Sequence, residues 1–524
     1  MFNLLPQAIR PSFPQNLLTR SAYTWSPDGK LRKTSYMDGI RGLAAFLVVI
    51  HHWTDMDFVH TSSAHGFWNY EQPGADRQLW RLPIVRLLYN GGHAMVPIFF
   101  VISGFSLAYK PVEYIRARKF DKLLLNLSSS MLRRAPRLCL PPIVMTFFVF
   151  IAIRLGWYDN RPLPQPLLEH FPSIITQFKD WIWDVTYLPD AFSWDFVIWL
   201  KYQPHTWTLN TELQGSKWVY MTILACCTLR QTPRLVVLAW WCLYCLWHLK
   251  YWTFLFCSGV FIAETHHVGE ALEAKAQKSH SLYHPLQTVD DAGTSRKHGD
   301  EDDIPLAKVV REDDDHESRV SAYPASSNLL GDSENVIAYS LLFIGLFFCS
   351  APYDEPQTKY MWWNTLWRWC PVPVPQPSGQ NHDYHEMVQR VYMGLGSVMT
   401  VFAISRLPSV QRFFEVPAMQ YLGKVSFGLY LIHGPIIMTV GWATLPVFWS
   451  WFKVGSYWPP VQWDGASQGP IYKDASRFWI EIAHWLCLGC MLPCMFWGAD
   501  LFTRFIDEPI LRATKRVHEK FAVS

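Results

Sequence analysis

The sequence predicts an all-α membrane protein: a polytopic transmembrane helical bundle of about ten spans with a disordered cytosolic insert. Half of the 524 residues are hydrophobic, and 27 of them are tryptophan. Charged residues make up 17% of the chain, against about 25% in soluble domains. The apolar residues are also gathered into blocks near the length of one bilayer crossing, about 20 residues, and polar connectors separate these blocks.

Ten apolar blocks, several with aromatic residues at their ends, are candidate spans. The fifth and sixth are short and almost continuous around Lys250. No secretory signal peptide is visible before the first block, which we expect to act as its own insertion signal. The blocks begin near Ile40, Ala94, Leu138, Lys217, Leu235, Tyr251, Val336, Val391, Ser426 and Phe478.

Basic residues test this count, because Lys and Arg collect in the cytosolic loops of membrane proteins. With ten spans, the basic clusters before the first span, after the second, fourth and eighth, and in the tail all fall on one side. The opposite loops are acidic, or rich in Trp and Pro as between Trp362 and Gln380. We therefore expect a multi-pass protein with both termini cytosolic, in the plasma membrane or an internal membrane.

Residues 265–335 differ from the rest of the chain. They are polar and rich in acidic runs such as Glu312–Asp315, with too little apolar area to offset the entropy of ordering. We interpret them as an acidic disordered cytosolic loop, a tether more readily than a regulatory element. The predicted order is a cytosolic N-terminal segment (1–35), six spans (36–264), this loop, four spans (336–510) and a basic cytosolic tail (511–524).

The eleven cysteines predict neither a disulfide framework nor a metal centre. Most lie in apolar stretches, where small residues pack between helices. Cys487, Cys490 and Cys494 superficially resemble an iron–sulfur run, but this spacing on an apolar helix needs nothing beyond packing. We therefore expect no bound metal.

The first span carries Arg41 and His52, which we single out as functional. They are eleven residues apart, which places them on one helical face about 16 Å apart. Arg41 then lies near the cytosolic rim and His52 near the middle of the membrane. A histidine at that depth is costly unless it is paired or faces a cavity, and imidazole is well suited to proton transfer near neutral pH. The alternative is a packed histidine bonded to a neighbouring helix.

Two further motifs lie in the second span and at the entry to the third. Ser103 and Gly104 permit close approach of helix backbones, or form a packing notch only. Arg134 and Arg137 share a helical face at i, i+3. Guanidinium groups fixed at a membrane entrance suit a phosphate-bearing ligand, although most such arginines are positive-inside anchors.

Later spans supply another acid and another histidine. Glu212 adjoins apolar sequence and would be costly if it were left unpaired there. His433 lies about ten residues into the ninth span, again near mid-membrane by the helical rise. Two intramembrane histidines and an acid are more than packing normally leaves in hydrocarbon.

These residues belong to motifs by which the chain resembles the membrane-bound acyltransferase family 3, especially its filamentous-fungal members. The motifs occur in the family order over residues 36–510, interrupted by the acidic loop. Many bacterial members continue with Phe-Tyr after the acid of the fourth motif, whereas Leu-Gln-Gly-Ser follows here, which looks like the fungal variant. The matching motifs are Arg41 with His52, Phe99–Phe105, Arg134 with Arg137, Trp207–Glu212, Ser426–His433 and Asp507–Pro509.

The resemblance implies a ten-helix enzyme that takes an acyl group, usually acetyl, from a cytosolic donor. It would pass that group to a hydroxyl of a carbohydrate, lipid or secondary metabolite. We expect acetyl-CoA or another acyl-CoA as co-substrate, a hydroxyl-bearing small molecule or glycan as acceptor, and no bound cofactor. A nucleic-acid partner is not expected.

The resemblance and the depth of each residue together suggest individual roles. Arg134 and Arg137, with Arg41, would hold the phosphates of the donor. His52 would be the general base for the acceptor hydroxyl, or would briefly carry the acyl group. The other candidates would orient or charge that histidine, in the case of Glu212, or complete the pocket, in the case of Ser103, Tyr430 and His433.

Two other classes of protein stay open. Ten spans and intramembrane histidines suit a proton-coupled transporter, but the sequence lacks an internal repeat and a matching pair of broken helices. A non-catalytic membrane sensor could keep the fold and use the acidic loop for signalling. Retention of both histidines and the arginine pair favours the enzyme over the sensor.

Overall fold

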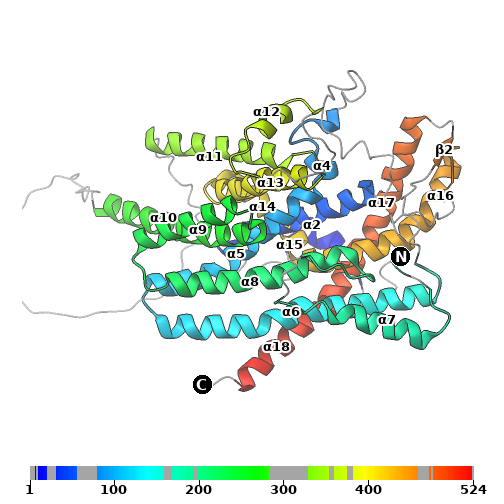
Figure 1. Ribbon diagram of the computed structural model, residues 1–524, viewed down its shortest axis with the longest axis horizontal. Coiled ribbons are helices and arrows are strands. Elements are labelled where there is room, and N and C mark those ends of the chain that lie inside the picture. Colours follow the sequence, from blue (N-terminus) through cyan, green and yellow to red (C-terminus); the bar gives the residue numbers. More distant parts are fainter. Residues whose placement is uncertain are drawn as a thin grey trace, which may run out of the picture.

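The computed structural model describes residues 6, 10–20, 31–55, 79–158, 168, 170–192, 197–282, 329–352, 359–374, 382–457, 471–473 and 476–521. Within these ranges the protein is a bundle of long α-helices, many of which run along the long axis of the molecule (Figure 1). The strands in these ranges form one short antiparallel hairpin, β1 (Gly455–Tyr457) with β2 (Ile471–Lys473). The predicted all-α membrane fold is confirmed.

Each of the ten predicted spans coincides with a long helix. The first six are α2 (Ser35–Asp55), α5 (Gly92–Arg116), α6 (Phe120–Arg154), α8 (Trp207–Cys226), α9 (Gln231–Trp247) and α10 (Tyr251–Leu282). The last four are α11 (Leu329–Cys349), α13 (His382–Ile404), α15 (Pro417–Ile436) and α17 (Arg477–Phe502). The expected break between the fifth and sixth spans lies at residues 248–250, where Leu249 has a φ of 54°.

Short helices occupy the connections. Before α8 they are α1 (Phe13–Asn16), η3 (Leu79–Arg81), α4 (Leu87–Asn90), α7 (Ile174–Thr186) and η4 (Pro204–Thr206). After α11 they are α12 (Trp363–Arg368) and α14 (Pro408–Phe414). Two long helices continue through π-helical turns: α15 through η6 (Ile437–Gly441) into α16 (Trp442–Trp451), and α17 through η7 (Thr503–Asp507) into α18 (Glu508–Phe521).

Five of the described helical segments are long and apolar enough to cross a membrane. They are Gly92–Arg116, Phe120–Arg154, His385–Ile404, Pro417–Trp451 and Phe478–Phe521. The described apolar part of α11, Ser333–Cys349, is shorter. These helices are those of an integral membrane protein, while the count of ten crossings stays a prediction.

Several boundaries differ from the sequence prediction, and α8 and α15 each begin about ten residues before their predicted starts. Residues 265–282 and 329–335, expected in the acidic loop, are helical ends of α10 and α11; residues 283–328 lie outside the described residues. Residues 270–275 are Glu, Ala, Leu and Lys, which have high helix propensity and extend a helix without an apolar face. Helix α6 begins at Phe120, not near Leu138, because Leu123 and Leu127 already present a buried helical face.

Glycine permits the closest helix contacts around the centre of the bundle. Helix α2 packs between α15 and α5, and α5 packs on α10. A Cβ on Gly42 would lie 2.3 Å from the backbone nitrogen of Gly423, and one on Gly104 would lie 2.1 Å from the carbonyl oxygen of Phe256. No side chain fits at such distances. The predicted close backbone approach at Ser103-Gly104 is therefore confirmed.

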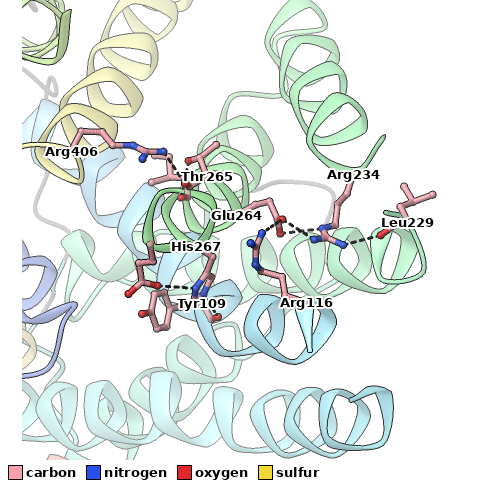
Figure 2. Close-up of polar contacts among 10 residues, drawn as sticks. Tyr109, Arg116, Leu229, Arg234, Glu264, Thr265, His267 and Arg406 are labelled. Atoms are coloured by element: carbon pink, nitrogen blue, oxygen red, sulfur yellow. Dashed lines mark hydrogen bonds and ion pairs between the residues drawn. The ribbon is translucent and has the colours of Figure 1, made fainter. Parts of the chain in front are cut away.

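A buried ion cluster ties α5, α9 and α10 together (Figure 2). The carboxylate of Glu264 is 0% exposed and accepts hydrogen bonds from Arg234 Nε at 3.0 Å and Nη2 at 2.7 Å. Arg116 Nη1 donates to the same carboxylate at 3.1 Å. Arg234 Nη1 also donates to the carbonyl of Leu229 at 2.8 Å. The two guanidinium groups compensate the buried charge, so this cluster fixes three helices relative to one another.

A second set of contacts holds the following turn of α10 (Figure 2). Arg406, just after α13, donates to the carbonyl of Thr265 at 2.7 Å. The imidazole of His267 hydrogen bonds to the carbonyl of Tyr109 on α5 at 2.9 Å. Helix α10 is therefore anchored to α5, α9 and the end of α13 where the predicted loop begins.

Candidate active site

A cavity of about 670 Å³ lies among α2, α5, α6, α8, α15, η7 and α18. Seven basic and four acidic side chains line it. This excess of positive charge favours an anionic ligand. The lining includes six of the eight residues predicted for the site: Arg41, Ser103, Arg134, Arg137, Glu212 and Tyr430.

Arg134 lies in the wall of the cavity where α5, α6 and α8 meet. Its Nη2 donates to Glu212 Oε1 at 2.7 Å and to Ser103 Oγ at 2.7 Å, and its Nε donates to Ser216 Oγ at 2.9 Å. Ser103 Oγ donates in turn to Glu212 Oε1 at 2.9 Å. Charge-assisted hydrogen bonds of this kind fix the orientation of both charged groups. Ser103, Arg134 and Glu212 therefore form one network.

The contacts of the Glu212 side chain can be compared with its predicted role beside a histidine. Its side-chain partners are Arg134 and Ser103, and neither is a histidine. Glu212 lies seven residues along the chain from His205, about 10 Å of helical rise, so the cavity wall, not the histidines, surrounds its carboxylate. Glu212 therefore pairs with a predicted donor-binding arginine, and its role in orienting or charging His52 stays a prediction.

The other two predicted donor-binding arginines reach the cavity in different ways. Arg41 Nη2 donates to Asp38 Oδ1 at 3.1 Å and to the carbonyl of Gly423 at 3.4 Å. Arg137 is exposed to the cavity. Its guanidinium makes no hydrogen bond or ion pair within the part of the chain that the structure describes. Arg137 is therefore the lining arginine most available to a ligand.

The two predicted histidines stack against each other beside this cavity. The ring centroids of His52 and His433 are 5.1 Å apart, and the rings are 20° from parallel. His205 completes a group of three, with its centroid 4.5 Å from that of His433 and 6.1 Å from that of His52. We call His52, His205 and His433 the histidine group. His433 is 0% exposed, and its Nε2 is buried without a hydrogen-bond partner among the described residues.

Tyr430 lies between the cavity and the histidine group. Its ring centroid is 5.5 Å from that of His205 and 5.8 Å from that of His433, and the residue also lines the cavity. The Tyr430 hydroxyl hydrogen bonds to Thr208 Oγ1 at 2.6 Å and donates to the carbonyl of His205. Tyr430 is therefore a lining residue of the cavity that also contacts two of the imidazole rings.

Sequence reasoning missed His205, because it precedes α8 in the short helix η4 and therefore lies outside the predicted spans. Gln203 positions it: the Gln203 amide nitrogen is 3.2 Å from His205 Nε2 and donates to the carbonyl of Leu431 on α15. Upstream, Asp184 on α7 accepts from the backbone N–H groups of Lys201 at 2.9 Å and Tyr202 at 3.1 Å. Burial raises the pKa of Asp184 above its usual range, against the effect of these two hydrogen bonds.

Two glycines make room for histidine rings. A Cβ on Gly434 would lie 2.5 Å from His205 Cε1, and one on Gly92 would lie 2.0 Å from Cδ2 of His51. The His51 ring contacts the ring of His52, with centroids 5.1 Å apart, and that of His93, at 4.7 Å. Gly434, in the sequence Ile-His-Gly-Pro, could therefore have indicated that an aromatic ring packs closely here. The sequence alone did not identify His205 as the residue that supplies the ring.

Apolar helices that suit a membrane and similarity to known acyltransferases indicate the class of protein, a membrane enzyme that transfers acyl groups. The family profile described as an acyltransferase domain matches residues 34–276. Over this part of the chain the sequence is similar to acyltransferase family 3, and the whole chain resembles fungal acyltransferases, as predicted.

Three relatives illustrate this resemblance. The chain is 26% identical over 470 residues to the O-acetyltransferase PaAT-1 of Phomopsis amygdali, covering 83% of this chain and 77% of that protein. It is 22% identical over 533 residues to acyltransferase R4 of a Phoma species and over 538 residues to acyltransferase clz18 of Cochliobolus lunatus. Each of these two alignments covers 94% of this chain and 97% of the relative. No solved structure matches the chain.

Proposed function

We propose that the protein is a membrane O-acyltransferase that moves an acetyl group from acetyl-CoA to a hydroxyl of a small molecule or glycan. The observation that carries this proposal is the cationic cavity that ends at Tyr430, directly beside the histidine group. An anionic donor fits the cavity, and a proton acceptor lies where the thioester of that donor would end. The name O-acetyltransferase, borne by one relative, supports acetyl as the acyl group.

The cavity offers two kinds of arginine to an acyl-CoA. Arg137, without a protein partner among the described residues, is suited to take a phosphate directly. Arg134 is held by Glu212, Ser103 and Ser216, so it contributes a fixed positive charge more than a free hydrogen-bonding fork. From the distribution of basic residues we expect this side of the bundle, and both termini, to face the cytosol, where acyl-CoA is found.

The chemistry assigned to the histidine group is general base catalysis. His52 accepts the proton of the acceptor hydroxyl while the oxygen attacks the thioester carbonyl. A C–O bond forms, the C–S bond breaks, and the leaving thiolate takes the proton back from the imidazole. No proton is gained or lost overall, which suits a base that is partly shielded from water.

The orphaned nitrogen of His433 supports this assignment. A buried polar atom without a partner is rare in folded proteins and calls for an explanation. His433 Nε2 is such an atom, and its ring stacks on that of His52. An incoming hydroxyl would satisfy this nitrogen and at the same time approach His52.

The test replaces His52 in purified protein reconstituted in lipid vesicles. With labelled acetyl-CoA and a hydroxyl-rich host metabolite extract, His52→Ala should lower the formation of labelled ester by at least about a hundredfold, the usual size of a general-base effect. Arg137→Gln should weaken acetyl-CoA binding, whereas Arg230→Gln, an exposed arginine before α9, serves as the matched control.

Two results would contradict the proposal. Unchanged ester formation by a folded His52→Ala protein would exclude His52 as the base. Movement of an extract solute across the vesicle membrane without ester formation, by the native protein, would favour the transporter alternative.

A further inference from the structure

The π-helical turn η7 (Thr503–Asp507) forms part of the cavity wall and packs against α6, the helix that carries Arg134 and Arg137. Its two ends, Thr503 and Asp507, both line the cavity and lie four residues apart, about one turn. A π-helical turn inside a long helix is uncommon and is often found at functional sites. The π-helical geometry of η7 therefore points to a functional role in addition to joining α17 to α18.

Both side chains are buried with polar atoms that have no partner. Thr503 is 2% exposed and Asp507 is 9% exposed. Thr503 Oγ1 and Asp507 Oδ1 make no hydrogen bond with any described residue. Leaving a buried hydroxyl and a buried carboxylate oxygen without hydrogen bonds destabilises a folded protein. Such atoms beside a cavity are expected where a ligand completes their hydrogen bonds.

The two residues lie at different depths along the cavity. Thr503 is next to α15 at Gly428, where a Cβ would lie 3.0 Å from Thr503 Oγ1. Gly428 is two residues from Tyr430, so Thr503 belongs to the deep end near the histidine group. Asp507 precedes Glu508, which pairs with Lys424 at 2.6 Å on the side of the cavity away from Tyr430.

The Thr503 hydroxyl and the Asp507 carboxylate suit a part of the ligand that is uncharged and donates hydrogen bonds. A carboxylate repels phosphate, so Asp507 does not serve the charged end of a nucleotide donor. A carboxylate and a hydroxyl instead accept hydrogen bonds from amide N–H or hydroxyl groups. An acyl-CoA carries such groups between its phosphates and its thioester, on the pantetheine arm with its two amides and one hydroxyl.

We propose that Thr503 and Asp507 form the subsite for the pantetheine arm of the donor. The inference rests on the proposed function, because it assumes an acyl-CoA in the cavity. The arm runs along η7 with its phosphates toward Arg137 and its thioester toward Tyr430. The turn thereby sets the depth at which the acyl group meets the histidine group.

The test compares two probes, CoA and S-acetylpantetheine, which has the arm but neither nucleotide nor phosphates. Binding is measured by competition with labelled acetyl-CoA on the purified full-length protein. Asp507→Ala should weaken S-acetylpantetheine about tenfold, as expected for a lost hydrogen bond to a charged group. Arg137→Gln should weaken CoA and leave S-acetylpantetheine unchanged.

A second pair of variants keeps the inference testable if Asp507→Ala does not fold. Thr503→Val has nearly the same shape but lacks the hydroxyl, and it should weaken both probes. Thr503→Ser retains the hydroxyl and should restore binding of both. Thermal unfolding of each variant in detergent confirms that the comparison concerns folded protein.

Two outcomes separate failure of the subsite from failure of the proposed function. If Asp507 only moderates the positive charge of the cavity, Asp507→Ala would tighten CoA and leave S-acetylpantetheine unchanged, which would overturn the subsite. If the native protein binds neither probe, the acyl-CoA donor itself is wrong and the subsite is wrong with it.

Discussion

His205 is the residue whose place in the site sequence reasoning did not foresee. Its ring contacts both His433 and Tyr430, and Gln203 holds its Nε2. It therefore stands between the cavity residue Tyr430 and the predicted base His52. We interpret His205 as a positioning residue that fixes the orientation of the imidazole rings of His433 and His52.

Replacing His205 by phenylalanine tests this interpretation. His205→Phe preserves a ring of similar width next to Gly434 but removes both ring nitrogens. We expect kcat to fall about tenfold to a hundredfold with little change in KM for acetyl-CoA, because the cavity is untouched. The rate should also change its dependence on pH, since the imidazole beside His433 and His52 is gone.

A purely structural role would give a different pattern. Gln203→Leu removes the hydrogen bond to His205 Nε2 while leaving the ring in place, and should move the pH profile in the same direction by less. If His205→Phe lowered thermal stability but left kcat and the pH profile of the folded fraction unchanged, the positioning role would be contradicted.

Most of the individual site residues could be named from the sequence because an ionisable side chain in a long apolar block is conspicuous. Their partners could not. Glu212 was expected to face a histidine, and its pairing with Arg134 follows only from the packing of α8 against α5 and α6. Asp507 was noted in the motif Asp507–Pro509, but its place beside Thr503 in the cavity wall was not predicted, because a π-helical turn shifts the face of the helix.

At the scale of helices, the ion cluster around Glu264 joins α5, which lines the cavity, to α9 and α10. Helix α5 carries Ser103, and α10 receives the close approach of α5 at Gly104. Movement of α10 would therefore displace α5 and change the position of the cavity wall.

The cluster predicts a large loss of stability when its carboxylate is removed. Glu264→Ala removes the carboxylate that Arg116 and Arg234 share. The guanidinium group of Arg234, which is almost wholly buried, would then lack a charged partner. Breaking a buried ion pair from one side costs about 3–5 kcal/mol. Thermal unfolding in detergent should show a marked decrease in the midpoint temperature.

Glu113 offers the matched control on the same helix as Arg116. It pairs with Lys110 at 2.8 Å and both side chains are about half exposed. Glu113→Ala should change stability by less than about 1 kcal/mol, as exposed pairs usually do. Equal effects of the two substitutions would contradict a special role for the Glu264 cluster.

The helices themselves were largely predictable, since each of the ten apolar blocks coincides with one. Their ends were not. Helix α10 continues past its apolar part through residues of high helix propensity, and α6 begins before its apolar part. Hydropathy locates the part of a helix that suits lipid, whereas local propensity and packing decide where the helix stops.

At the scale of the whole molecule, the helices bring together motifs that lie far apart in the sequence. Arg41, Arg137, Glu212 and Tyr430 come from four different helices and line one cavity. The predicted topology orients this cavity relative to the membrane. Its charged part would face the cytosol, and the end nearest the histidine group would lie inside the membrane. The account depends on this direction.

A cryo-electron microscopy map with bound ligand tests the direction most directly. The ligand is an acetyl-CoA analogue in which a methylene replaces the sulfur of the thioester, so that it cannot react. We predict density through the cavity, with a phosphate group at Arg137, the arm along Thr503 and Asp507, and the acetyl carbonyl past Tyr430 within reach of His52. Density in the reverse direction, or on another face of the bundle, would contradict the proposed enzyme mechanism.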